Sequence, residues 1–148
     1  MNTILNPNNS EIKKFKIFPH WKQKTKEYYE VFIFDSLNSM YKYYQYTGGY
    51  AELDFLAICR DLNIYKGDIP LNKIGEILIP ISELKLQIIS HECGHAVFQY
   101  IRKTHQEKMW TYLNEDKTIW KMEEMYCQIL EELVKQFYQE LDYIVYDI

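Results

Sequence analysis

The segment His91-Glu92-Cys93-Gly94-His95 constrains this chain more than any other part of the sequence. It is an H-E-x-x-H motif, and it lies in a stretch whose apolar periodicity predicts a helix. Residues four apart in a helix lie one turn apart on the same face, so His91 and His95 can both reach one metal ion. Glu92 would lie beside that ion, where a carboxylate can take a proton from an activated water molecule. The motif therefore predicts a helix that carries two metal ligands, His91 and His95, and a general base, Glu92.

Length and charge narrow the class of protein. A chain of 148 residues has the size of one domain and can bury a core without disulfides. We therefore expect one domain over residues 1–148, with the polar, Asn-rich residues 1–10 as a flexible tail. The net charge of −4 provides no basic stripe for phosphates, so nucleic acid is not expected as a partner. The lysines from Lys13 to Lys26 are interpreted as the solvated face of an edge strand.

The cysteines and the N-terminal residues indicate the compartment. Cys59, Cys93 and Cys127 are odd in number and widely spaced, which favours reduced thiols in a cytosol-like environment. The first residues contain no apolar stretch typical of a signal peptide, and no apolar run reaches the length of a membrane span. The sequence therefore predicts a cytoplasmic protein without a membrane segment.

The first half of the chain has the pattern of strands with one helix. Apolar, aromatic and β-branched runs predict strands at residues 15–18, 28–34, 53–60 and 74–81. Asp35 or Ser36 can cap a helix that continues to about Tyr46, and residues 63–70 are expected to form a loop. Pro80 suggests that the strand from Ile74 to Ile81 lies at an edge of the sheet or that the strand ends there.

The motif helix is predicted at about residues 83–103, with Ser82 as its cap. On a helical wheel it is apolar on two faces. One face includes Ile89 and Val97 and is expected to pack on the sheet. The opposite face includes Phe98 beside the two histidines and is expected to line a cleft.

A catalytic zinc ion usually has three protein ligands and one open position. One class of H-E-x-x-H enzymes continues with a Gly and a third His, but this chain has Phe98 and Ile101 at those positions, which excludes that class. The other large class takes a Glu from a later helix. Such a helix is predicted here from about residue 118 to residue 143, and it contains two candidates, Glu123 and Glu124.

The periodicity of this later helix favours Glu123 over Glu124. Glu123 falls at the centre of an apolar stripe, whereas Glu124 falls on the polar face. The stripe consists of Ile119, Tyr126, Leu130, Val134, Phe137 and Leu141. A carboxylate on a buried face is costly unless it is paired or bound to a metal. We therefore expect Glu123 to be the third ligand. The alternatives are that Glu123 pairs with a Lys or Tyr, or that a slightly rotated helix presents Glu124.

Oxyanion stabilisation has several candidates, and the sequence does not choose among them. They are Arg102, His105, Tyr112 and Tyr126.

The chain from Leu53 to Leu141 resembles minimal gluzincin-type metallopeptidases, including small phage-encoded zincin-like proteins and the ImmA/IrrE family. The likeness is carried by the strand IGEILIPI, the helix IISHECGHAVFQYI and the later helix beginning MEEMYCQILEEL. The resemblance implies an α+β, zincin-like fold. In that fold a small mixed or antiparallel sheet packs on the motif helix and on a C-terminal helix that carries the third ligand.

The same resemblance implies a function and a cofactor. It implies one zinc ion per chain held by His91, His95 and Glu123, with Glu92 as general base in the hydrolysis of peptide bonds. In such folds an extended peptide or protein substrate can add to the sheet edge beside the metal helix. The strand from Ile74 to Ile81 is the expected edge. Tyr126 stands where the family commonly has a small residue.

Two other functions are compatible with the sequence. A phage or mobile-element protein can keep a zincin scaffold and act as a catalytically silent binding protein, although the complete set of His91, Glu92 and His95 argues for catalysis. A deformylase-like metal amidase would use an upstream Cys ligand, for which Cys59 is the candidate. The E-G-C motif of that family is absent, because Ile58 precedes Cys59.

Overall fold

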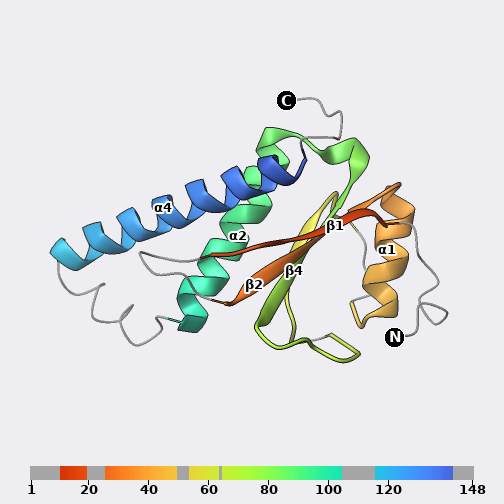
Figure 1. Cartoon of the computed structure of the whole chain (residues 1–148), viewed down its shortest axis with the longest axis horizontal. Helices are drawn as coiled ribbons and strands as arrows, with labels where there is room; N and C mark the ends of the chain where they lie inside the picture. The colour runs from red at the N-terminus through yellow and green to blue at the C-terminus, as the bar shows by residue number, and fades with distance from the viewer. Residues whose placement is uncertain (1–10, 20–25, 50–53, 64, 105–115, 142–148) are drawn as a thin grey trace.

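The computed structural model describes residues 11–19, 26–49, 54–63, 65–104 and 116–141. Its elements in chain order are the strands β1 (Glu11–Ile17) and β2 (Tyr28–Phe34), the helix α1 (Leu37–Tyr46), the strands β3 (Ile58–Asp61) and β4 (Lys73–Pro80), the 3-10 helix η2 (Ile81–Glu83), and the helices α2 (Leu86–Thr104) and α4 (Asp116–Glu140). The described chain is therefore an α+β fold, as the sequence predicted (Figure 1).

The four strands form one mixed sheet in the order β1-β2-β4-β3. Strand β2 pairs antiparallel with β1 and parallel with β4, and β3 pairs antiparallel with β4. The expectation that the strand from Ile74 to Ile81 is an edge is wrong, because β4 is paired on both sides. All residues of β4 are buried, the charged Lys73 and Glu76 included, as expected for a strand in the interior of a sheet with both faces covered. Pro80 lies at the last position of the strand, where a missing N–H costs least.

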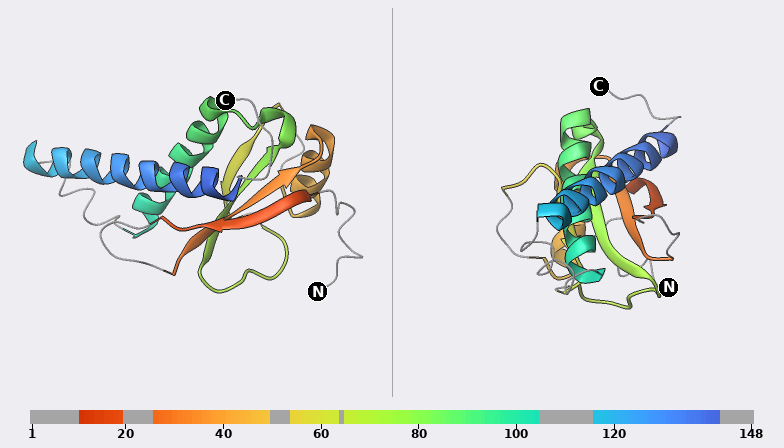
Figure 2. Two further views of the ribbon diagram at one scale, coloured as in Figure 1. Left: turned by 45° about the horizontal axis from the view of Figure 1, so that its top comes forward. Right: turned by 90° about the vertical axis from the view of Figure 1, so that its left-hand side faces the viewer.

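Helices cover both faces of the sheet. Figures 1 and 2 show α1 on one face and α2 with α4 on the other. Helix α4 also contacts the edge strand β1, where the rings of Phe15 and Phe137 meet edge to face with centroids 5.2 Å apart. The Gln136 side chain accepts from the Phe18 N–H at 2.7 Å, and its amide donates to the Phe18 carbonyl at 3.1 Å. These contacts fix the C-terminal half of α4 against β1.

Several predicted elements agree with the structure. Strand β2 has the predicted bounds, and α1 follows Ser36, whose Oγ accepts from the Ser39 N–H at 3.1 Å as an N-cap. Lys14 and Lys16 project from the edge strand β1 and are exposed, which confirms the interpretation of these two lysines. Among the described helices, none is long and apolar enough to cross a membrane.

Other strands and helices begin or end at residues that differ from the prediction. Strand β1 begins earlier than expected, and β3 is shorter, with no strand at residues 54–57. Ser82 is not the cap of the motif helix, because it lies within η2 and α2 begins only at Leu86. The expected tail at residues 1–10 and the expected end of the C-terminal helix at about residue 143 lie outside the described residues.

A cluster of buried charges lies under α1. Glu76 of β4 is 0% exposed and accepts hydrogen bonds from Lys73 at 2.6 Å and from the Tyr43 hydroxyl at 3.0 Å. It also accepts from Arg60 Nε at 3.0 Å, so the central strand is tied to β3. Lys73 in turn binds Glu30 of β2 at 2.8 Å. The cluster therefore links three neighbouring strands through paired charges.

Glu76→Gln should destabilise the protein by about 3–5 kcal/mol, because two buried cations lose their shared carboxylate. Urea unfolding followed by circular dichroism measures this loss. Glu140→Gln, at an exposed position of α4, is the control and should change the free energy of unfolding by less than about 0.5 kcal/mol. Equal stability of the two variants would show that the cluster does not stabilise the fold.

Candidate metal centre

The buried face of α2 decides where the motif residues point. This face packs against the sheet and α4, and it consists of Ile89, Cys93, Ala96, Val97, Tyr100 and Ile101. His91 and His95 lie outside it and are exposed, and Phe98 is 51% exposed. The expectation of two buried faces is therefore wrong: among the described residues, the sheet and α4 cover one side of the helix, and the histidines face away from it.

The two histidines are arranged as a chelating pair. Their Nε2 atoms lie 3.1 Å apart, and their rings are nearly perpendicular, with an interplanar angle of 84°. Two nitrogens bound to one tetrahedral zinc ion at about 2.0–2.1 Å would lie about 3.4 Å apart. Partial burial and the charge of His91 lower the pKa of His95, which favours the neutral imidazole that metal binding requires. The pair therefore fits a zinc ion with little movement.

Glu92, next to His91 in the chain, is buried against the edge strand β3. It is 5% exposed, and its carboxylate accepts a hydrogen bond from the backbone N–H of Cys59 in β3. Burial raises the pKa of Glu92 above its ordinary value, while the charge of His91 and the Cys59 bond act in the opposite direction. A carboxylate with a raised pKa accepts a proton more readily near neutral pH, as a general base must.

The structure places Glu123 differently from the expectation. Helix α4 buries a row of residues spaced four apart, which consists of Met125, Ile129, Leu133, Phe137 and Leu141. Glu123 is exposed and is not part of this row, so the expectation that it lies on the buried face is wrong. Tyr126, Leu130 and Val134, each one residue later, only flank the row. The helix is rotated relative to the expected stripe, and Glu124 is half-buried.

Helix α4 contacts the histidine-bearing part of α2 through Tyr126, about one turn after Glu123. The Tyr126 hydroxyl donates to the carbonyl of Gly94 at 3.5 Å, and Glu123 lies three residues, about one turn, before Tyr126. Gly94 permits this approach, because a Cβ there would lie 3.1 Å from the Tyr126 hydroxyl. Even so, no three His, Cys, Asp or Glu side chains among the described residues lie close enough together to hold a metal ion. The structure brings His91 and His95 together but not the third ligand.

The cysteines occupy two kinds of environment, and all three are free thiols. Cys59 and Cys93 are buried, and burial raises the pKa of both, that of Cys93 to about 12. The Cys59 thiol donates to Gln99 Oε1 at 3.8 Å, on the side of α2 that faces β3. Cys59 is therefore not grouped with the histidines as a deformylase-like site would require. Cys127 is exposed.

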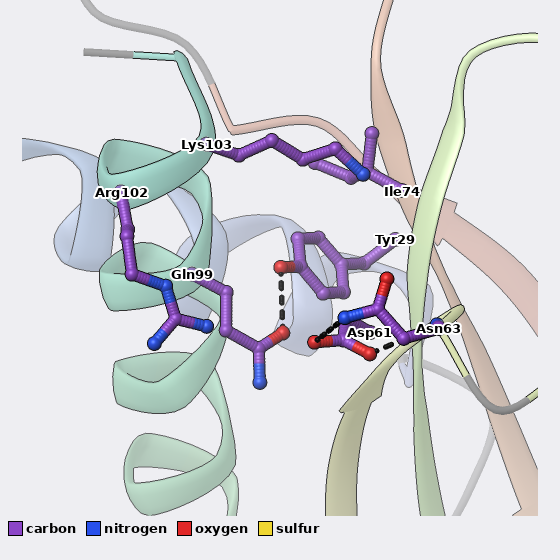
Figure 3. A pocket seen from close by; sticks show the side chains of 7 residues that line it. All are labelled: Tyr29, Asp61, Asn63, Ile74, Gln99, Arg102 and Lys103. Carbon is purple, nitrogen blue, oxygen red and sulfur yellow. Dashed lines mark hydrogen bonds between the residues drawn. The ribbon is translucent and has the colours of Figure 1, made fainter. Parts of the chain in front are cut away.

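Sequence reasoning missed a polar pocket next to the motif. It has a volume of about 270 Å³ and lies between the C-terminal part of α2 and the sheet (Figure 3). Its lining residues are Tyr29, Asp61, Asn63, Ile74, Gln99, Arg102 and Lys103. The spacing of Glu92, Gln99 and Arg102 on α2 is a signal for one polar row along the helix, but its partners on the strands are distant in sequence. Of the oxyanion candidates, Arg102 lines this pocket, and His105 and Tyr112 lie outside the described residues.

Comparison of the chain with protein-family models, with curated proteins and with solved structures finds no match. The residues of α2, β3 and α4 therefore indicate the function. The metal pair, the buried carboxylate and the polar pocket all lie along one helix, α2.

Native protein should react with iodoacetamide at Cys127 long before Cys59 or Cys93, because only Cys127 is exposed. Mass spectrometry of peptides after timed labelling measures the order. The same labelling in concentrated urea, where all three thiols should react, is the control. Rapid labelling of Cys93 in the native protein would contradict the packing of α2 described above.

Proposed function

We propose that this protein is a zinc-dependent metallopeptidase with a zincin-like fold. The observation that carries the proposal is the pair of histidine Nε2 atoms 3.1 Å apart, next to a buried Glu92 that the edge strand β3 holds. The mixed sheet with a long motif helix on one face supports it, as does the resemblance of the motif segment to gluzincins.

Zinc would be held by His91 and His95 through their Nε2 atoms, with Glu123 as the proposed third ligand. Its position about one turn before Tyr126, which contacts α2 at Gly94, supports Glu123. Glu123 must move to join the histidines, because no third donor is grouped with them among the described residues. A bound zinc ion supplies Lewis acidity to the substrate carbonyl and to the attacking water molecule.

Glu92 performs the proton transfers. Its carboxylate takes a proton from the water molecule that attacks the peptide carbonyl, and it then delivers this proton to the leaving amine. The contact with the Cys59 N–H holds the carboxylate at the sheet edge while leaving the motif histidines outside. Burial of Glu92 favours proton acceptance, because it destabilises the charged carboxylate.

The substrate is an extended peptide that adds to the edge of the sheet. With β4 in the interior, β3 is the edge strand beside α2, and it takes the role that the sequence assigned to the strand from Ile74 to Ile81. Main-chain hydrogen bonds to a free edge bind peptides with little regard to sequence, and pockets for side chains add specificity. Cys59 marks the point on β3 that lies next to Glu92.

A catalytically silent zincin scaffold that binds a protein partner is the second candidate function. The observation in its favour is that no third donor joins His91 and His95 among the described residues. Such a protein would bind its partner equally well with Glu92→Gln and would never cleave it.

Purified protein should contain about one zinc ion per chain, and His91→Ala and Glu123→Ala should each lose it. Plasma mass spectrometry measures the zinc content. Glu124→Ala replaces the adjacent carboxylate and should keep the ion, which makes it the matched control. Loss of zinc from the Glu124 variant alone would reassign the third ligand, and absence of zinc from the wild type after zinc is supplied would favour the silent scaffold.

Glu92→Gln should keep zinc and lose at least about 100-fold in kcat/KM, because an amide cannot accept the proton. Cleavage of a proteome-derived peptide library, followed by mass spectrometry, measures turnover. Glu131→Gln, at an exposed position of α4, is the control and should cleave like the wild type. Full activity of the Glu92 variant would exclude the mechanism.

A further inference from the structure

The pocket beside the motif carries an excess of positive charge. Arg102 and Lys103 form no ion pair with any residue that the structure describes. Asp61 is the acidic lining residue, and its two oxygens accept from the backbone N–H and the side-chain amide of Asn63, at 3.0 and 3.1 Å. The pocket therefore has two cations and one carboxylate, and that carboxylate is already hydrogen-bonded to Asn63.

Gln99 adds a neutral donor to the same pocket. Its Oε1 accepts from the Tyr29 hydroxyl at 2.9 Å and from the Cys59 thiol at 3.8 Å, and Figure 3 shows the first of these bonds. Burial raises the pKa of Tyr29 above its usual range, so the hydroxyl stays protonated and donates. With the amide oxygen occupied, the Gln99 Nε2 group has no partner among the described residues and is left as a donor.

Figure 3 shows Gln99 and Arg102 side by side on α2, opposite Tyr29 and Asp61 of the sheet, while Lys103 extends toward Ile74. A guanidinium, an ammonium and an amide that face a cavity of about 270 Å³ form a donor set for an anion. Arginine in particular suits a carboxylate, because its planar fork can form two parallel hydrogen bonds.

The pocket lies at a defined distance from the motif. Gln99 is seven residues after Glu92, and Arg102 is seven residues after His95. At 1.5 Å per residue, each interval spans about 10.5 Å along the helix axis. An extended peptide covers this distance in about three residues. Strand β3 runs alongside both places, because Cys59 lies next to Glu92 and Asp61 lines the pocket.

We propose that this pocket is a specificity subsite that binds a carboxylate of the peptide substrate about three residues from the cleaved bond. The carboxylate is an acidic side chain or the C-terminal carboxylate of the peptide. The proposal rests on the proposed peptidase function and adds a substrate class to it: peptides that are acidic at this distance from the cleavage point.

The test compares cleavage of matched peptides. Sequences cleaved by the wild type in a proteome-derived peptide library identify a good substrate, which is resynthesised with Glu or Gln at the third residue on either side of the cleaved bond. Each peptide is made with a free and with an amidated C-terminus. The wild type should prefer the peptide with the carboxylate by about tenfold or more in kcat/KM, the factor expected for a hydrogen bond to a charged group.

The double variant Arg102→Gln/Lys103→Gln should reduce this preference to about one. Arg102→Glu/Lys103→Glu should reverse it in favour of a Lys at the same peptide position, a result that general damage to the site would not produce. The double variant Lys85→Gln/Lys121→Gln is the charge-matched control. It removes two exposed lysines, one just before α2 and one in α4, and it should keep the preference for Glu. Zinc content and circular dichroism of every variant verify the fold.

The outcomes separate the two proposals. Cleavage without a carboxylate preference, or a preference that survives in the Gln double variant, overturns the subsite and leaves the peptidase function intact. Absence of zinc-dependent cleavage by the wild type overturns both. If Glu is preferred over Gln whether or not the C-terminus is amidated, the bound group is an acidic side chain. If the free C-terminus is preferred over the amidated one with either residue, the bound group is the C-terminal carboxylate.

Discussion

Burial of one face of α2 fixes the direction of every candidate catalytic group. Ile89, Cys93 and Val97 are fully buried against the sheet and α4, so the helix cannot rotate without exposing them. A rotation by one residue is about 100°, which would exchange the positions of Glu92 and its neighbours. In the observed orientation the histidines face outward as a chelating pair, and Glu92 reaches the edge strand. The separation of metal ligands from proton acceptor is a consequence of packing.

The buried charges on the α1 face of the sheet hold β3 in the position that places Glu92 and the pocket. Strand β3 has only four residues, and its hold on β4 includes the bonds of Arg60 to Glu76. Arg60 also donates to Thr47 at 2.7 Å, which ties β3 to the end of α1. Because side chains alternate along a strand, Cys59 and Asp61 then point to the α2 face. Cys59 meets Glu92, and Asp61 lines the pocket, so the ion cluster positions both parts of the site.

The sequence predicted those elements whose signals lie within a few neighbouring residues. Strand β2 and the cap of α1 at Ser36 follow from aromatic, β-branched and capping residues, and the motif helix follows from its periodicity. The interior position of β4 was not predictable in this way, because an apolar run indicates a strand but does not name its neighbours. Glu123 was misplaced because α4 carries two adjacent apolar rows, one through Met125 and one through Tyr126, and periodicity alone does not choose the buried one.

Helix α4 is held in its middle as well as at its C-terminal half, because Met125 and Ile129 are buried in the same core as α2. The C-terminal half is fixed to β1 through Phe137 and Gln136, whereas Figures 1 and 2 show the N-terminal end projecting beyond α2. Glu123 lies toward that end, one turn before the contact of Tyr126 with Gly94. Under the proposed function, the free energy of zinc binding is available to draw this end of α4 toward His91 and His95, since ligand geometry and folding are coupled in metal sites. Because Met125 and Ile129 are buried, a movement of Glu123 would have to occur in the part of α4 before Met125, and it would leave the packing of α2 on the sheet, and with it Glu92, in place.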